Sequence, residues 1–198
     1  MQFAKLAINI LLGAIAMIPT LKTERLFLRP FTIADATMVQ SLAGAFEIAD
    51  TTLTIPHPYE DGLAESWIKL HLPAFEAMRA VTFAITLGEE KSVMGAISLM
   101  SIESGHQAEL GYWIGVPFWG KGYCSEAAKR IIEYSFFNLG LERVHAGCLT
   151  RNPASAKVIE KNGFSLEGLR REHIKKWGVY EDLNIYGLLK NDWMATNK

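Results

Sequence analysis

The spacing of hydrophobic positions changes several times along the first eighty residues, and each change predicts a new element. Apolar residues alternate with period two over residues 22–30, which predicts a strand. Helical spacing then predicts a helix over Ile33–Gly44. Two prolines predict a loop at residues 55–59. A second helix follows over about residues 60–79, and Pro73 should kink it or end it early.

Three strands in series are predicted next, over residues 81–87, 92–102 and 108–115. The polar turn at residues 88–91 joins the first two into a hairpin. Alternation in the third strand places successive side chains on opposite faces. One face carries Glu109, Gly111 and Trp113, and the other carries Leu110, Tyr112 and Ile114.

The spacing becomes helical again from Gly120 and predicts an amphipathic helix that Gly140 closes. Residues 143–150 then predict a strand. Asn152 is a favourable N-cap, and the proline after it suits the first position of a helix. We therefore expect a short helix that ends near Gly163.

Two final strands, over residues 164–170 and 180–189, surround a turn near residues 176–178. After the first twenty residues no repeat or linker divides the chain. The order of elements predicts one mixed α/β domain over residues 21–193, followed by a tail at residues 194–198.

Composition and charge narrow the class of protein. The chain has 198 residues, of which 49% are hydrophobic and 21% charged, as in an ordinary globular domain. The formal net charge is −1 and no long basic run occurs, which argues against a nucleic-acid partner. Two cysteines without a C-x-x-C pair and five histidines without an H-x-x-H pattern argue against a metal site. Free thiols fit a reducing compartment.

The strongest local signal is Trp119-Gly120-Lys121-Gly122-Tyr123, between a predicted strand and a predicted helix. A helix N-terminus exposes unpaired N–H groups and the positive end of the dipole, and glycines let the backbone approach an anion closely. A phosphate or pyrophosphate is the natural occupant. The segment is not a P-loop, and a dinucleotide fingerprint would need glycine at Ser125. An ordinary strand-to-helix turn is the alternative.

Six blocks of sequence together resemble the GNAT superfamily over residues 21–193. They are Thr23–Pro30, Glu109–Ile114, Trp119–Tyr123, Asn152–Ser155, Gly163–Phe164 and Glu167–Gly168. The resemblance is closest to the branch that contains the ribosomal-protein alanine and serine N-acetyltransferases. It implies a mixed α/β fold whose mostly antiparallel sheet is flanked by helices on both faces. It also implies acetyl-CoA as co-substrate and no metal, and it is compatible with a homodimer.

The same resemblance implies how the cofactor is held. The backbone of the loop would bind the CoA pyrophosphate, through Trp119, Gly120, Lys121, Gly122, Tyr123 and Cys124. Ile114 and Val116 would align the pantetheine arm as if it were another strand. Pro117 departs from the Gln or Arg that many members carry three residues before the first glycine. Binding through backbone N–H groups does not need that side chain.

Acetylation of an amine needs a proton acceptor, a polarised thioester and a donor for the departing thiolate. The resemblance places Ser155 near the CoA sulfur, as an acid or a hydrogen-bond donor. Its alternative role is helix capping. Many members use a tyrosine four residues further on, where this chain has Ile159. Asn152 is expected to cap the helix and to contact the pantetheine arm.

Two glutamates compete for the role of base. Glu109 lies on the strand that leads to the cofactor, and Glu172 matches a glutamate of the alanine/serine branch. Either could instead be a solvated surface carboxylate. Cys124 suggests a covalent acetyl-enzyme only weakly, because no histidine stands at a suggestive position beside it. Direct transfer in a ternary complex is the expectation.

Aromatic side chains could line a groove for the acceptor. Tyr59, Trp67 and Phe75 are candidates along the early helices, with core packing as the alternative, and Trp177 is another near the last turn. The predicted activity is acetyl transfer from acetyl-CoA to a primary amine. A protein or peptide N-terminal α-amine is the first expected acceptor. A small amine, or a module that only senses acyl-CoA, is the alternative.

The first twenty residues lie outside the resemblance. Their apolar run, residues 6–18, is shorter than the roughly 18–20 residues that a membrane span needs. It resembles a signal-peptide core, but an extension upstream of a start at Met17 and an extra packed helix are alternatives. We favour the last two, and a cytoplasmic location, because acetyl-CoA is a cytosolic co-substrate.

Overall fold

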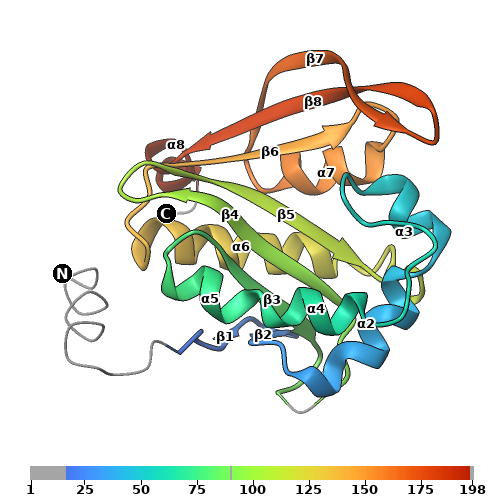
Figure 1. Cartoon of the computed structure of the whole chain (residues 1–198). Coiled ribbons are helices and arrows are strands. Elements are labelled where there is room, and N and C mark those ends of the chain that lie inside the picture. Colours follow the sequence, from blue (N-terminus) through green and yellow to red (C-terminus); the bar gives the residue numbers. More distant parts are fainter. Residues whose placement is uncertain (1–16, 90, 197–198) are drawn as a thin grey trace.

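The computed structural model describes residues 17–89 and 91–196, and one eight-stranded sheet lies at its centre (Figure 1). The strands are β1 (Leu21–Lys22), β2 (Phe27–Arg29), β3 (Val81–Thr86), β4 (Gly95–Glu103), β5 (Gln107–Ile114), β6 (Arg143–Leu149), β7 (Ser165–Lys176) and β8 (Val179–Leu189). They lie in the order β1-β2-β3-β4-β5-β6-β8-β7. Neighbouring strands are antiparallel except β5 and β6, which are parallel. The predicted mixed α/β fold with a mostly antiparallel sheet is confirmed.

Helices cover both faces of this sheet (Figure 1). Helices α6 (Tyr123–Phe137) and α7 (Pro153–Lys161) lie on one side, where the larger hydrophobic cluster joins α6 to Leu110 and Ile114. Helices α2 (Ala36–Ala43) and α4 (Leu63–Lys69) lie on the other side, where a second cluster includes Trp113. The two clusters confirm the alternation predicted for β5. The remaining helical elements are η1 (Ile33–Asp35), α3 (Phe46–Thr51), α5 (His71–Glu76), η2 (Val116–Phe118) and α8 (Lys190–Thr196).

The first predicted strand is two short strands, β1 and β2, because a turn interrupts it. The Thr23 hydroxyl oxygen accepts a hydrogen bond from the Leu26 N–H at 2.8 Å, and the Thr23 N–H donates to the Leu26 carbonyl at 2.9 Å. A threonine side chain that bonds to nearby backbone competes with the strand ladder. Alternation alone does not reveal this competition.

The predicted helix over residues 60–79 is also two elements. Helix α4 ends at Lys69, and α5 begins at His71 with Pro73 in its first turn. A continuous helix would need an N–H at Pro73, and proline has none. Two short helices, α3 and α8, were not predicted. Helix α8 continues beyond residue 193, and its Trp193 ring lies 5.9 Å from the ring of Phe136.

The parallel pair β5 and β6 creates the opening on which the site depends. The strands pair from Gln107↔Arg143 to Glu109↔His145 and then diverge (Figure 1). On the other side of β5, the Gly115 N–H donates to the Met94 carbonyl at 2.8 Å, which fixes the phase of the β4–β5 ladder. Leu110, Tyr112 and Ile114 therefore direct their backbone N–H and C=O groups toward the gap.

The predictions for residues 1–16 lie outside the described part of the chain. Just after them, Ile18 is 8% exposed and belongs to the larger hydrophobic cluster. Within residues 17–89 and 91–196, no helix is both long enough and apolar enough to cross a membrane.

Candidate active site

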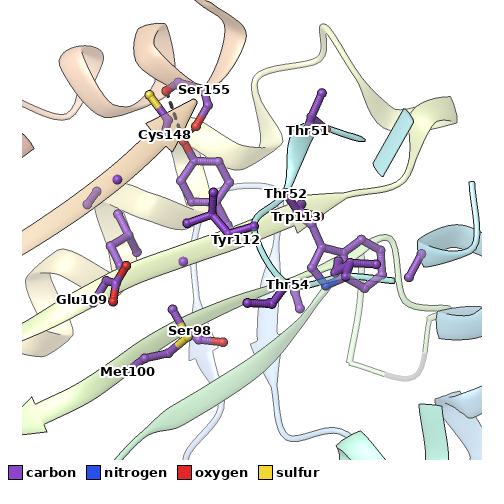
Figure 2. A pocket seen from close by; sticks show the side chains of 18 of the residues that line it. Thr51, Thr52, Thr54, Ser98, Met100, Glu109, Tyr112, Trp113, Cys148 and Ser155 are labelled. Carbon is purple, nitrogen blue, oxygen red and sulfur yellow. Dashed lines mark hydrogen bonds between the residues drawn. The ribbon is translucent and has the colours of Figure 1, made fainter. Parts of the chain in front are cut away.

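Two cavities meet where β5 and β6 diverge. The loop cavity, of about 530 Å³, is lined by the glycine loop, the start of α6 and helix α7. The sheet cavity, of about 600 Å³, lies against β4 and β5 and is covered by α2, α4 and residues 51–56 (Figure 2). Five residues line both: Thr51, Thr52, Tyr112, Trp113 and Ser155. A molecule in one cavity can therefore reach a molecule in the other at these shared side chains.

The glycine loop has the backbone that an anion cradle needs. Gly120 and Gly122 have φ values of +74° and +77°, in the left-handed region that favours glycine. Gly122 is the N-cap of α6, whose 15 residues align their peptide dipoles toward the loop cavity. A Cβ built on Gly120 meets nothing within 4 Å, so its requirement for glycine is conformational. The loop fits a pyrophosphate on these grounds.

A polar network ties the glycine loop to the beginning of the domain. Glu126, in the first turn of α6, accepts hydrogen bonds from the Thr23 hydroxyl at 2.5 Å and from Arg25 Nε at 2.6 Å. Arg25 Nη1 also donates to the Lys121 carbonyl at 3.1 Å, and the guanidinium lies 4.9 Å from the Tyr123 ring centroid. Burial raises the pKa of Glu126, but the bonds from Thr23 and Arg25 outweigh it and hold that pKa below its ordinary value. The network fixes the loop against α6.

The predicted cofactor contacts divide into two groups. Ile114, Trp119, Gly120, Gly122, Tyr123, Cys124, Asn152 and Ser155 line the loop cavity, and Val116 and Lys121 do not. Val116 lies in η2 and packs against the second hydrophobic cluster. The Lys121 ammonium lies 5.7 Å from the Phe118 ring centroid. The Trp119 indole donates to the Ile114 carbonyl at 2.7 Å, so one backbone group at the gap already has a partner.

Ser155 and Tyr112 form a hydroxyl pair at the junction of the cavities. Their oxygens lie 2.8 Å apart, and the Tyr112 hydroxyl also lies 3.1 Å from the Ser155 carbonyl, to which it donates (Figure 2). Burial raises the pKa of Tyr112 well above its ordinary value, although the Ser155 bond lowers it, so the phenol stays protonated. Tyr112 was not among the predicted site residues. Its place on the same face of β5 as Ile114, toward the expected cofactor, was the available signal.

Asn152 connects the two helices beside the junction. Its side-chain oxygen accepts from the Ser155 N–H at 3.0 Å, which confirms the predicted N-cap of α7. Its amide nitrogen donates to the Thr51 carbonyl at 3.2 Å, at the end of α3. One side chain thus orients Ser155 and fixes a wall that both cavities share.

Four successive carbonyls at the end of α3 accept hydrogen bonds from side chains elsewhere in the fold. Lys176 Nζ donates to Ala49 and, at 2.6 Å, to Thr52. Arg151 donates to the Asp50 carbonyl at 3.0 Å, and Asn152 completes the set at Thr51. The last carbonyls of a helix lack partners within it, and cations there complement the helix dipole. We call this set of bonds the α3 clamp.

The two candidate bases lie in different surroundings. Glu109 lines the sheet cavity, and its parallel-strand partner is His145 (Figure 2). Burial lowers the pKa of His145, while the nearby charge of Glu109 opposes that change. Glu172 lines neither cavity. It is exposed on β7 with φ at +49°, within the register shift between Arg170 and Ile174, and its N–H donates to the Asp182 carboxylate at 2.7 Å.

The other predicted candidates are also located. Tyr59 and Trp67 line the sheet cavity, whereas Phe75 is 4% exposed in the larger hydrophobic cluster. Trp177 lines neither cavity, and its indole donates to Asp50 at 2.9 Å. Burial raises the pKa of Cys124 to about 12, so its thiol is protonated at neutral pH. Among the described residues, no group of three or more His, Cys, Asp or Glu side chains could hold a metal ion.

The glycine loop at the start of α6 suits a phosphate-bearing donor, and the adjoining sheet cavity leaves room for a second substrate, which is the arrangement expected of a group transferase. Residues 25–165 match the family described as Acetyltransferase (GNAT) domain, and the chain belongs to this family. It is an acetyltransferase whose family uses acetyl-CoA. The predicted family is therefore confirmed.

Proteins similar to this chain, at several degrees of similarity, are named as acetyltransferases. The chain is 32% identical to "Uncharacterized N-acetyltransferase p20" of Bacillus licheniformis over 88% of this chain and 98% of that protein. It is 33% identical to the ribosomal-protein-serine acetyltransferase of Escherichia coli (strain K12), over 50% of this chain and 55% of that protein. The spermidine N-acetyltransferase of Vibrio cholerae, solved with CoA and spermine, superposes with a TM-score of 0.75 at 22% identity, covering 87% and 99% of the chains. This last likeness shows the fold alone.

Proposed function

We propose that this acetyltransferase transfers the acetyl group of acetyl-CoA to the N-terminal α-amine of a polypeptide, by direct attack in a ternary complex. The proposal rests on the Tyr112–Ser155 pair. This pair lies between the loop cavity, whose glycine loop suits a pyrophosphate, and the sheet cavity, which Glu109 lines. Donor and acceptor can approach from opposite sides and meet at these two hydroxyls.

In this proposal, acetyl-CoA binds in the loop cavity. The N–H groups at the start of α6 suit the pyrophosphate, and the glycines let it approach them. The backbone groups of Tyr112 and Ile114 face the gap, where an extended pantetheine arm can pair with them as an added strand. Val116 and Lys121 have no part in this binding mode through their side chains.

The sheet cavity supplies the proton acceptor. The incoming ammonium loses a proton to Glu109, directly or through a water, and the neutral amine then attacks the thioester carbon. A C–N bond forms, the C–S bond breaks, and its electron pair leaves with sulfur. The nitrogen gives its second proton to the departing thiolate, directly or through water, so that CoA leaves as the thiol. Tyr112 stays protonated, and its O–H can turn from the Ser155 carbonyl to Ser155 Oγ. The Ser155 hydroxyl is then free to donate a hydrogen bond to the departing thiolate.

Direct transfer is favoured over a covalent acetyl-enzyme. A cysteine attacks as its thiolate, and the pKa of Cys124, raised to about 12 by burial, keeps that form scarce. Support for a polypeptide acceptor is the sequence resemblance and the name of the serine acetyltransferase relative. A small amine is the second candidate, because a structural neighbour is named for spermidine.

The test measures free CoA released from acetyl-CoA with a panel of peptide amides and small amines. Tyr112→Phe, Ser155→Ala and Glu109→Gln are each expected to lower kcat at least about tenfold. Tyr180→Phe is the matched control for the phenol, since Tyr180 is 59% exposed, and Glu172→Gln is the control for the carboxylate.

The outcomes separate the candidates. Turnover of peptides but not of small amines supports the polypeptide acceptor, and the reverse result supports the second candidate. Tight binding of acetyl-CoA by calorimetry without CoA release from any amine would instead indicate a module that senses acyl-CoA. Loss of activity in the controls equal to that in the site variants contradicts the assigned roles.

A further inference from the structure

The sheet cavity is nearly devoid of charge. Of the described residues that line it, Glu109 is the only one with a carboxylate, and none carries an ammonium or guanidinium group. The rest of the wall is apolar or bears a neutral hydroxyl, with Trp67, Trp113 and Ile55 on the apolar part and Thr54 and Ser98 among the hydroxyls. Its volume of about 600 Å³ lies within the roughly 300–1,000 Å³ that hold small ligands.

Several charged groups around this cavity are paired with one another, whereas Lys176 is held by the Ala49 and Thr52 carbonyls and Glu65 acts on Tyr59. Asp50 and Glu181 are both paired with Arg151, at 2.8 Å each. Arg29 and Asp35 form another pair at 2.8 Å, with both side chains largely buried. None of these charged groups lines the cavity. On the wall itself, the charge that an acceptor meets is therefore that of Glu109.

The floor beside Glu109 is apolar. Met100 on β4 is the cross-strand partner of Glu109, so their side chains lie on the same face of the sheet (Figure 2). A Cβ built on Gly111 would lie 2.6 Å from the Met100 methyl group, so that side chain lies over the glycine. A carboxylate at position 100 would project into the same cavity.

We propose that the sheet cavity selects acceptors with one ammonium group on an uncharged, largely apolar body, and rejects acceptors with a second positive charge. The inference rests on the proposed function, in which Glu109 takes the proton of the reacting ammonium. A second ammonium would then enter without a carboxylate partner and would lose its hydration. A peptide with an apolar first residue and a free apolar monoamine share the favoured chemistry, whereas a polyamine does not.

The experiment compares acceptors that differ in one charge. Hexylamine and 1,6-diaminohexane have the same carbon chain, and the amides of Leu-Gly-Gly and Lys-Gly-Gly differ at the first side chain. We expect kcat/KM to be on the order of 100-fold higher for the singly charged member of each pair. Activity with both pairs shows that the cavity accepts free amines as well as peptides. Activity with the peptide pair alone shows that it accepts only peptides.

A charge added to the cavity should change this selectivity. Met100→Glu places a second carboxylate beside Glu109 and is expected to raise the diamine-to-monoamine ratio of kcat/KM at least about tenfold. Met38→Glu is the matched control, because Met38 lies on α2, is 38% exposed and does not line the cavity. Circular dichroism and thermal unfolding establish whether both variants fold. If Met100→Glu does not fold, the ratio measured for the wild-type enzyme decides the inference.

The two proposals fail in different ways. Equal or better turnover of diaminohexane or spermidine by the wild-type enzyme would overturn the charge selection while leaving acetyl transfer intact. Absence of CoA release with every amine would refute the proposed function itself. An unchanged ratio in a folded Met100→Glu variant would show that the second charge does not enter this cavity.

Discussion

Acid should destabilise the domain through His71, and the size of the effect can be worked out. His71 opens α5, is 8% exposed, and packs against the rings of Trp67 and Phe31 at centroid distances of 4.4 and 5.2 Å. Neither ring nitrogen has a hydrogen-bond partner among the described residues. Burial lowers the pKa of His71 from 6.5 to about 4, because the charged imidazolium would lose its hydration there.

The lowered pKa fixes the sign of the effect. Above pH 6.5 the imidazole is neutral in both states and makes no pH-dependent contribution. As the pH falls toward 4, the unfolded chain binds a proton that the folded protein does not, so the free energy of unfolding decreases. Each pH unit within this window costs up to about 1.4 kcal/mol, which gives about 2 kcal/mol between pH 7 and pH 5.

The perturbation is His71→Phe, which keeps a planar ring and removes the titration. Urea unfolding at pH 7 and pH 5 gives the free energy of unfolding for the variant and the wild type. We expect the acid-induced loss to be about 2 kcal/mol smaller in the variant. His173→Gln, at an exposed position of β7, should retain the wild-type loss. Parallel losses in His71→Phe and the wild type would refute the reasoning.

Two further predictions concern the networks around the cavities. Glu126→Gln weakens the hydrogen bonds that hold the glycine loop, so KM for acetyl-CoA should rise about tenfold while kcat changes less than about twofold. Steady-state kinetics that show a lower kcat with an unchanged KM would argue against a positioning role for Glu126. Lys176→Met leaves the Ala49 and Thr52 carbonyls without their charged donor and should lower the free energy of unfolding by about 2–3 kcal/mol. Lys175→Met, at an exposed neighbour on β7, should cost less than about 0.5 kcal/mol in the same denaturation assay, and equal losses would count against the clamp.

Much of the fold followed from local patterns. The long helix α6, the hairpin of β3 and β4, and the N-cap at Asn152 were predicted because each depends on residues within a few positions of one another. The turn at Thr23 was missed, because a side chain that bonds to the backbone overrides the hydrophobic period there. The break predicted from Pro73 is confirmed, and it lies just before the proline, between Lys69 and His71.

The residues of the candidate site differ in how far the sequence points to them. Ser155 and the loop residues other than Lys121 line the cavities, whereas Tyr112 and His145 carried no signal strong enough to select them. Glu109 and Glu172 were equivalent in sequence. Glu172 lies in a stretch of β7, residues 165–173, in which every residue is exposed, and the alternation of the sequence does not reveal that exposure.

Most of the helices and strands and the glycine loop before α6 can be predicted from the sequence, because helix periodicity, strand alternation and glycine conformations are local properties. The surroundings of the two cavities depend instead on tertiary contacts. Tyr112 meets Ser155 across 43 positions, and Lys176 reaches Ala49 across 127. Such contacts arise from strand register and from the divergence of β5 and β6. These are set by how the whole sheet packs, so no window of sequence contains them.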